Sequence, residues 1–429
     1  MSSSRSADRP GPGPEGGPRP RDGQGPRDPE RPIRVALFGA TGSIGRQTVE
    51  VLARDGRFEV VGLAGGRNTA LLGDQVRALR PRVVVTAEDA DLGALGDLPR
   101  ASTIQVGAAA LEALAGRDDL DLLIVGTGGM VSLRPVLVAL GAGTPVATAN
   151  KETLVAGGHL VMPLARALAA GRAAEAPGDP LASALGWLRP IDSEHSAIWQ
   201  CLVGEAPGTI ARLILTASGG PFLDVDAARL ETVTPEQALR HPTWSMGAKI
   251  TIDSATLANK GLEVVEAHWL YDVDYDAIDV VIHPQSVVHS AVQFVDGSLK
   301  AQLGTPDMRL PIQYALTHPH RLPSPATAPD LVEIGRLEFR APDLGRFPAL
   351  RIAREAGRMG PWATAALIAA DEVAVARFLE GTLDFPGIPR LLGAAVERYG
   401  RQAGPPPSVD DLVALDAEIR GSYASGVIA

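Results

Sequence analysis

Short runs of consecutive apolar residues alternate with longer segments of helical periodicity in the first part of the chain. The apolar runs are IRVALF (33–38), FEVVGLA (58–64), RVVVT (82–86), DLLIVGT (121–127) and PVATAN (145–150). Strands that are apolar throughout, rather than alternating, are typical of a parallel sheet that helices cover on both faces. The pattern therefore predicts an α/β fold that begins with a doubly wound nucleotide-binding domain.

The middle of the chain has a different pattern, in which strands surround one amphipathic helix. We expect strands in ARLILTASGG (211–220), KITID (249–253) and residues 279–304, and the helix in SATLANKGLEVVEAHWLY (254–271). Asp253 or Ser254 is the expected N-cap of that helix, because both side chains can accept a hydrogen bond from its first turn. These elements predict a central α+β domain.

Segments of helical period also follow a proline-rich passage after residue 317, and they predict a small all-α C-terminal domain. Residues 171–186 are rich in Ala, Gly and Pro and are expected to form an exposed loop or linker. At roughly 150 residues per domain, a chain of this length holds two or three domains. We predict a disordered Pro/Gly-rich tail (1–32), a nucleotide-binding domain (33–191), a catalytic domain (192–316), a linker (317–346) and a helical domain (347–429).

Composition and charge exclude several classes of protein. The net charge of −10 has the wrong sign for sequence-independent binding of nucleic acid. The single cysteine, Cys201, cannot form an internal disulfide or a cysteine-based zinc site. Apolar stretches are too short for a membrane span, and the acidic N-terminal tail lacks the features of a targeting signal. We therefore expect a cytoplasmic protein that binds neither nucleic acid nor membrane.

A glycine-rich turn follows the first expected strand directly. The sequence GATGSIG (39–45) opens a helix, so that backbone N–H groups at the helix start can face a pyrophosphate. Its spacing is G-x-x-G-x-x-G rather than the usual dinucleotide fingerprint, and such a turn can also be purely structural. The second strand leads to Arg67 and Asn68 instead of an acidic residue, and a cation at this place favours the 2′-phosphate of NADP over NAD.

Three carboxylates are candidate metal ligands. Asp192 and Glu194 are two residues apart, and Glu263 lies one helical turn after Lys260. Each feature alone is more typical of a solvated loop or a surface ion pair. Together, hard oxygen ligands without cysteines or paired histidines favour Mg²⁺ or Mn²⁺ over zinc.

Hydroxyl, amide and histidine side chains are unusually dense between residues 216 and 290. They occur in TASGGPF (216–222), RHPTWSMG (240–247), DSATLANKG (253–261) and HPQSVVHS (283–290). Any one of these residues is more often a helix cap or a core residue than a catalytic group. Their density indicates a site that holds a phosphate by hydrogen bonds and one positive charge.

These motifs, in this order and together with GGRN (65–68), ANKE (149–152) and DSEH (192–195), resemble one family over about residues 33–425: the 1-deoxy-D-xylulose 5-phosphate reductoisomerases. The resemblance implies an NADPH-dependent enzyme that makes 2-C-methyl-D-erythritol 4-phosphate for isoprenoid synthesis. It implies a metal-assisted rearrangement of the carbon skeleton followed by hydride reduction, a small phosphorylated sugar as substrate, and a homodimer.

The resemblance also assigns roles to individual residues. It implies NADPH contacts from Thr41, Gly42, Ser43, Ile44, Gly66, Arg67, Asn68, Asn150, Glu152 and Gly247. It implies that Asp192, Glu194 and Glu263 bind the metal. It implies substrate contacts from Lys151, Ser193, Glu194, Ser218, His241, Trp244, Ser254, Asn259, Lys260 and Glu263. The expected catalytic residues are Lys151, Asp192, Glu194, Glu263, His195, His241 and His289.

Within the resemblance, the segment with Pro242, Trp244 and Met246 is a mobile lid that excludes water from the substrate. The chain departs from the family pattern at Asp371, where the family usually has Asn, and in its long N-terminal tail. Two alternatives stay open: another NADPH-dependent oxidoreductase of the semialdehyde dehydrogenase type, and a non-catalytic NADP-binding sensor. The first needs a thiol nucleophile, and Cys201 in IWQCL looks more like a core residue.

Overall fold

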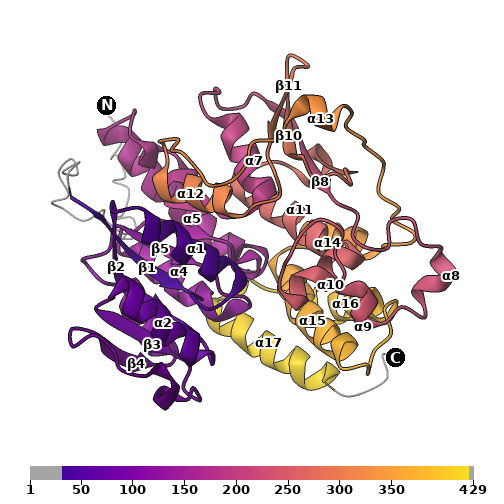
Figure 1. Cartoon of the computed structure of the whole chain (residues 1–429). Coiled ribbons are helices and arrows are strands. Elements are labelled where there is room, and N and C mark those ends of the chain that lie inside the picture. The colour runs from indigo at the N-terminus through magenta and orange to yellow at the C-terminus, as the bar shows by residue number, and fades with distance from the viewer. Residues whose placement is uncertain (1–30, 425–429) are drawn as a thin grey trace, which may run out of the picture.

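The computed structural model describes residues 31–424, so almost all of the tail predicted to be disordered lies outside the described residues. The first part of the described chain is a seven-stranded parallel sheet in the order β4-β3-β2-β1-β5-β6-β7. Helices lie on both of its faces (Figure 1). The predicted doubly wound α/β fold is therefore confirmed.

The elements of this first part are β1 (Ile33–Phe38), α1 (Ser43–Arg54), β2 (Phe58–Ala64), α2 (Thr69–Leu79), β3 (Val83–Thr86), β4 (Thr103–Val106), α3 (Ala108–Ala115), β5 (Leu122–Val125), α4 (Leu133–Gly141), β6 (Val146–Thr148), α5 (Lys151–Glu175), α6 (Ala184–Trp187) and β7 (Leu188–Pro190), with short 3₁₀ helices at Leu92–Leu95, Met130–Ser132 and Pro180–Ala182. The central strands β1 and β5 are buried almost throughout, which explains their continuous apolar sequences.

The second part is built on a four-stranded sheet in the order β11-β10-β8-β9, in which β8 and β9 are parallel and the other pairs antiparallel. Its elements are α7 (Ser193–Leu202), β8 (Ile210–Ala217), α8 (Ala227–Leu230), α9 (Pro235–Ala238), α10 (Ala248–Thr256), α11 (Ala258–Tyr271), the 3₁₀ helix Tyr275–Ala277, β9 (Ile278–Ile282), β10 (Val288–Phe294), β11 (Leu299–Leu303) and α12 (Arg309–Thr317). The predicted α+β arrangement is present.

The C-terminal part is helical, as predicted: α14 (Ala349–Met359), α15 (Pro361–Leu379), α16 (Gly387–Tyr399) and α17 (Val409–Tyr423). The short helix α13 (Leu331–Ile334) precedes it, in the segment predicted as a linker. Helix α17 begins beside the first part of the chain and runs away from it along the lower edge of Figure 1, toward the C-terminal end. Arg134 of α4 pairs with Asp410 of α17, and His159 of α5 is 2.7 Å from the Pro407 carbonyl oxygen. These two contacts hold the start of α17 against α4 and α5.

Helix α5 runs through the middle of the molecule and contacts α4, α11 and α15. By length and composition it could cross a membrane, but over half of its most apolar stretch is buried inside the protein. It begins with Lys151 and Glu152, both buried, and contains Pro163. These features identify α5 as a core helix that places its first residues at the junction of the three parts.

The strand predicted at KITID (249–253) is wrong, because these residues belong to α10. Their β-branched side chains favour strands by propensity. In the structure, however, the Thr251 hydroxyl donates to the Gly247 carbonyl oxygen at 2.8 Å, and Ile252 is fully buried. This local hydrogen bond and the burial of Ile252 in the core thus outweigh the strand propensity of these residues.

The helix predicted over 254–271 is interrupted, so the predicted N-cap is also wrong. Leu257 has φ of 60°, in the left-handed region, and separates α10 from α11. Asp253 and Ser254 lie inside α10 and cap nothing. The break turns the first residues of α11 toward the cavity described below.

The exposed loop predicted at 171–186 is also contradicted. Helix α5 continues to Glu175, and a 3₁₀ helix and α6 follow after a short turn. Asp179 holds that turn by accepting from Arg172 and from the Leu181 N–H. Local capping therefore orders a segment whose composition resembles a linker.

Candidate active site

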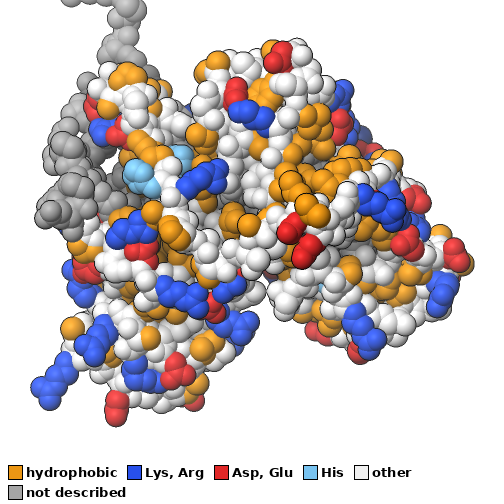
Figure 2. All heavy atoms as spheres, turned by 45° about the horizontal axis from the view of Figure 1, so that its top comes forward, with side chains coloured by type: hydrophobic (Ala, Val, Ile, Leu, Met, Phe, Trp, Pro, Cys, Tyr) orange, Lys and Arg blue, Asp and Glu red, His pale blue; other side chains and the backbone are white. Residues whose placement is uncertain are grey.

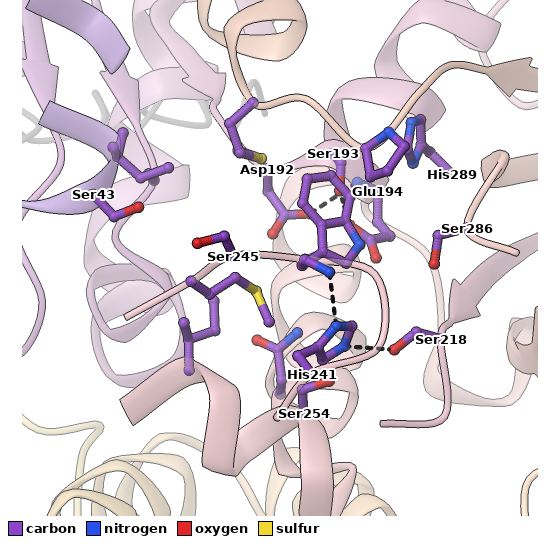
Figure 3. A pocket seen from close by; sticks show the side chains of 18 of the residues that line it. Ser43, Asp192, Ser193, Glu194, Ser218, His241, Ser245, Ser254, Ser286 and His289 are labelled. Atoms are coloured by element: carbon purple, nitrogen blue, oxygen red, sulfur yellow. Dashed lines mark hydrogen bonds between the residues drawn. The ribbon is translucent and has the colours of Figure 1, made fainter. Parts of the chain in front are cut away.

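A cavity of about 660 Å³ lies between the first sheet and the second part of the chain. Figure 3 shows Ser43 of α1 on one side of it and Ser218, Ser286 and His289 on the other. Its volume suits a ligand of drug or cofactor size. Figure 2 shows acidic and basic side chains intermixed over one face of the molecule.

Three carboxylates meet in this cavity. Asp192 is the N-cap of α7 and accepts from the N–H groups of Glu194 at 3.0 Å and His195 at 3.2 Å. This cap orients Asp192 and places Glu194 in the first turn of the same helix, while α11 supplies Glu263. One oxygen from each of Asp192, Glu194 and Glu263 lies within 4.8 Å of the others. This set of hard oxygen donors fits a Mg²⁺ or Mn²⁺ ion.

Two ammonium groups occupy the space among these carboxylates. Lys151 binds Asp192 and lies 3.5 Å from Glu263. Lys260 lies 2.8 Å from Glu194 and also binds Glu263. All five side chains are mostly or fully buried, so both lysines compensate charges that would otherwise be costly to bury.

The pKa values reflect this crowding. Burial, and then repulsion by Glu194, raise the pKa of Glu263 to about 7. Burial would also raise the pKa of Asp192, but the Lys151 ammonium outweighs it and holds that pKa below its usual range. Burial alone would lower the pKa of Lys151, whereas its carboxylate neighbours raise it well above the ordinary value. Lys151 is therefore an ammonium donor at neutral pH.

Ser218 and His241 form the opposite side of the cavity. The Nδ1 atom of His241 accepts from the N–H groups of Thr243 at 3.1 Å and Trp244 at 2.9 Å, so Nε2 carries the proton and donates to Ser218 Oγ at 2.9 Å. Burial lowers the pKa of His241, which keeps the ring neutral. Since Ser218 Oγ also accepts from the Gly220 N–H, its own hydroxyl hydrogen is left to donate into the cavity.

Close backbone packing brings Ser218 and the start of α11 together. Gly220 has φ of 67°, and a Cβ at this residue would lie 2.9 Å from the Ser254 carbonyl oxygen. Only glycine allows this approach. Ser254 and Asn259 consequently face the same cavity, and the Asn259 amide donates to Glu263 at 2.6 Å.

The predicted lid borders the cavity. Trp244, Ser245 and Met246 line it, and the Trp244 ring lies 6.1 Å from the ring of His289. The two hydrogen bonds to His241 described above fix the start of this segment. A ligand in the cavity would be covered by Trp244.

The glycine-rich turn lies at the end of β1 beside this cavity. Gly39 has φ of 78°, and a Cβ on Gly45 would lie 2.1 Å from the Gly39 carbonyl oxygen, so neither position accepts a side chain. Gly42 precedes α1 without a side-chain cap, which leaves the first N–H groups of α1 open to an anion. This geometry fits the pyrophosphate of a dinucleotide.

Other predicted cofactor residues lie beyond the cavity wall. Arg67 follows β2, is 80% exposed in its side chain, and pairs with Asp89 at 2.9 Å. Asn68 caps α2 through the Leu71 N–H. Asn150 is buried, caps α5 and donates to the carbonyl oxygens of two residues of the loop after β5.

The structure brings most of the predicted site residues to one cavity. Those that line it are Ser43, Ile44, Lys151, Asp192, Ser193, Glu194, Ser218, His241, Trp244, Gly247, Ser254, Asn259, Lys260, Glu263 and His289. Those that do not are Thr41, Gly42, Gly66, Arg67, Asn68, Asn150, Glu152 and His195.

His195 requires a correction, because it is fully buried behind the wall and cannot be reached from the cavity. Its Nε2 atom lies 3.3 Å from Glu266, and its carbonyl oxygen accepts from the Tyr271 hydroxyl at 2.5 Å. As the third residue of α7, it turns inward while Glu194 turns to the cavity. A direct catalytic contact by His195 is therefore not supported.

A second group of charges, which we call the Lys249 cluster, was not predicted from the sequence: it consists of Lys249, whose side chain is 32% exposed, and the buried carboxylates of Glu152, Asp253 and Asp371. Lys249 Nζ lies 2.6 Å from Asp371, 2.8 Å from Asp253 and 3.6 Å from Glu152. Its carboxylates come from α5, α10 and α15, one in each part of the chain. Only the i, i+4 spacing of Lys249 and Asp253 was visible in the sequence.

Glu266 was not predicted from the sequence either, although it lies one helical turn after Glu263 and so shares its face of α11. Pro306, Asp307, Met308 and Arg309 line the cavity as well. They come from the turn into α12, and no motif pointed to them.

The thiol needed by a semialdehyde dehydrogenase is not in the cavity wall. Cys201 is buried on α7, and burial raises the pKa of its thiol to about 11. A thiol in this environment is a poor nucleophile at neutral pH. The position of Cys201 thus disfavours the semialdehyde dehydrogenase alternative.

Comparisons with known proteins agree on one family. The model of 1-deoxy-D-xylulose 5-phosphate reductoisomerase matches residues 35–158, and models of the C-terminal domains of the same enzyme match residues 188–271 and 303–422. The enzyme of this name from Pelotomaculum thermopropionicum is 47% identical over 386 residues, which cover 89% of this chain and 95% of that protein. The one from Thermosynechococcus vestitus is 45% identical over 391 residues, covering 90% and 91%.

Solved structures of such enzymes are also similar. The reductoisomerase from Zymomonas mobilis in complex with NADPH has a TM-score of 0.80 and 37% identity, covering 92% of this chain and 98% of that one. A reductoisomerase in complex with NADPH, fosmidomycin and magnesium has a TM-score of 0.81 and 35% identity, covering 91% and 97%.

Proposed function

Since this chain belongs to the 1-deoxy-D-xylulose 5-phosphate reductoisomerase family, we propose that the residues of its cavity carry the family's reaction in the roles given below. The protein is an NADPH-dependent enzyme that converts 1-deoxy-D-xylulose 5-phosphate to 2-C-methyl-D-erythritol 4-phosphate, a precursor of isoprenoids. The observation that carries the assignment of roles is the convergence of three carboxylates beside the glycine-rich turn.

Asp192, Glu194 and Glu263 would hold the divalent cation. When bound, such a cation supplies Lewis acidity and orients the substrate oxygens. The three carboxylates set its position, because Asp192 is fixed by its capping bonds and Glu263 by the Asn259 amide. Lys151, protonated and buried at the same place, would donate a hydrogen bond from Nζ to a substrate oxygen.

The glycine-rich turn and the start of α1 would hold NADPH, which supplies the hydride for the reductive step. Ser43 and Ile44 of that turn line the same cavity as Lys151, so a cofactor held by the turn would be next to the proposed metal ligands. Arg67 is exposed and would pair with the 2′-phosphate through the guanidinium nitrogens that do not face Asp89. The other cofactor contacts implied by the resemblance stay predictions.

The substrate phosphate would lie against Ser218, Ser254, Asn259 and Lys260. Ser218 is prepared to donate because the neutral His241 donates to its oxygen. Lys260 supplies a positive charge next to the carboxylates. Closure of Trp244 over this region would exclude water from the reacting carbons.

We retain the predicted domain division, with a cofactor-binding domain (33–191), a catalytic domain (192–316), a linker (317–346) and a helical domain (347–429). It is supported by the end of the first sheet at Pro190 and by Asp192 opening α7.

We also propose a cytoplasmic homodimer. Val295 and Leu299, at the turn into the edge strand β11, are apolar and more than half exposed, and a second copy could cover them. Sedimentation equilibrium would measure the mass in solution, and a purely monomeric protein would contradict the dimer. Fractionation of cells that produce the protein would test its location.

The test of function is the loss of NADPH absorbance after 1-deoxy-D-xylulose 5-phosphate is added to the purified protein with Mg²⁺ or Mn²⁺. We expect oxidation of NADPH that stops when a chelator removes the metal, and formation of the branched product. Binding of NADPH without any oxidation would instead favour the sensor alternative.

A further inference from the structure

Glu266 is a buried carboxylate just behind the three proposed metal ligands. It is 4% exposed and does not line the cavity. Its Oε2 atom lies 3.7 Å from Lys151 Nζ and 3.3 Å from His195 Nε2, yet makes no hydrogen bond with suitable geometry. A buried carboxylate oxygen without such a bond is costly. The burial of the Glu266 carboxylate is therefore not explained by a contribution to stability.

Lys151 faces three carboxylates in this structure. It binds Asp192 most closely, lies 3.5 Å from Glu263 and 3.7 Å from Glu266. Asp192 and Glu263 are also proposed ligands of the divalent cation, whereas Glu266 lies outside the group of converging oxygens. The ammonium and the cation thus compete for two carboxylates, and Glu266 is the one carboxylate near Lys151 that the cation leaves free.

The surroundings of Glu266 keep it in place. His195 packs against it from α7, and the Tyr271 hydroxyl fixes the His195 backbone by donating to its carbonyl oxygen. Neither ring nitrogen of His195 has a hydrogen bond of good geometry, so the ring leaves the Glu266 oxygen able to accept from an approaching ammonium.

We propose that Glu266 is a positioning residue, which holds the Lys151 ammonium when a divalent cation takes Asp192, Glu194 and Glu263. Without Glu266, the Lys151 ammonium would stay paired with Asp192 and weaken cation binding, or the bound cation would repel it from the cavity wall. The inference rests on the proposed function for the presence of the cation, but its test needs neither substrate nor turnover.

The test is a double-mutant cycle that measures Mn²⁺ affinity by isothermal titration calorimetry on the full chain. Glu266→Gln in the otherwise unchanged protein should weaken Mn²⁺ binding about tenfold, because Lys151 then competes for Asp192. In the Lys151→Met background the competitor is gone, and Glu266→Gln should change Mn²⁺ affinity by less than about twofold. Such non-additivity is the expected sign of residues that act through each other.

Two outcomes would overturn the proposal. An equal loss of Mn²⁺ affinity in both backgrounds would show that Glu266 acts independently of Lys151, as a metal ligand or a general structural residue. No loss of affinity in either background would show that Glu266 does not position Lys151 for metal binding. Glu266→Asp keeps the negative charge but moves it away from Lys151. It should weaken Mn²⁺ binding by an intermediate amount, and only when Lys151 is present. This variant replaces Glu266→Gln in the test if the Gln variant does not fold. Glu355→Gln, which removes the charge of an exposed glutamate paired with Arg351, is the matched control and should leave Mn²⁺ affinity unchanged.

This measurement is independent of the assay for function. If the unmodified protein fails to oxidise NADPH with 1-deoxy-D-xylulose 5-phosphate but the cycle is non-additive, the proposed function fails and the role of Glu266 stands. If it oxidises NADPH but the cycle is additive, the role of Glu266 fails alone.

Discussion

The Lys249 cluster predicts that Asp371→Asn stabilises the protein at alkaline pH. Asp371 is completely buried and shares one ammonium with Asp253 and Glu152. The asparagine has the same shape and can still accept a hydrogen bond from Lys249, but it removes one of the three negative charges.

The magnitude follows from the distances. With an effective dielectric constant of about 20, the attraction between Lys249 and Asp371 at 2.6 Å is worth about 6 kcal/mol. The distances to Lys249 place Asp253 within about 5 Å and Glu152 within about 6 Å of Asp371, and each would repel it by about 3 kcal/mol. When all three carboxylates are ionised, which the raised pKa of Asp253 restricts to high pH, these terms cancel and the cost of burying the Asp371 charge is left uncompensated. We expect a net gain of about 1 kcal/mol on its removal.

The pH dependence has a definite sign. Burial, and then repulsion by Asp371, raise the pKa of Asp253 well above its usual value. A carboxyl group whose pKa is raised in the folded state contributes stability at low pH, and this contribution is lost as the pH rises through the folded pKa. Asp371→Asn lowers that pKa, so less stability is lost on going to high pH. The advantage of the variant should therefore grow between pH 5 and pH 9.

The assay is thermal unfolding followed by circular dichroism at several pH values, without cofactor or metal. A gain of about 1 kcal/mol corresponds to a rise of roughly 2 °C or more in the unfolding midpoint. The control is Asp384→Asn, which makes the same change in an exposed pair with Arg390 and should alter stability by less than about 0.5 kcal/mol. A lower midpoint at pH 8, or an equal shift at pH 5 and pH 8, would refute the reasoning.

Three further predictions concern the cavity and the thiol. Glu263→Gln should lower kcat/KM by about 10³ while isothermal titration finds NADPH binding intact, because the residue lies among the proposed metal ligands and not on α1; an active variant would remove Glu263 from the metal site. Arg67→Ala should raise the KM for NADPH about tenfold and leave that for NADH unchanged, since only NADPH carries the 2′-phosphate; equal effects on both cofactors would contradict this role. Cys201→Ser should keep the rate of NADPH oxidation within about twofold, and a large loss would revive the thioester alternative.

Hydrophobic pattern was enough to locate the central strands. The apolar runs at 33–38 and 58–64 coincide with β1 and β2, because strands buried on both faces need continuous apolar sequence. Strand β4 was missed, since all four of its residues are exposed at the sheet edge and carry no such signal. Segment 249–253 was misassigned because its structure depends on packing with distant residues rather than on its own propensity.

The site residues that could be predicted from the sequence are those that lie next to one another in a motif. DSEH places Asp192 as a helix cap and Glu194 in the next turn, so their roles follow from local structure. The same motif gave no means of seeing that His195 turns away from the cavity. Glu266 and the Lys249 cluster depend on contacts between segments more than 60 residues apart, and one sequence does not record such contacts.

Three successive residues at the start of α5 take part in three different contacts: Asn150 with the loop after β5, Lys151 with the metal-site carboxylates, and Glu152 with Lys249. A small rotation of this one helix would therefore move the loop after β5, the metal-site carboxylates and Lys249 of α10 at the same time. Chimeric enzymes that join the first 150 residues of one relative to the remainder of another would have to preserve all three contacts at a single junction. The residue at position 371, although it lies 220 positions later, would need to be exchanged along with that junction.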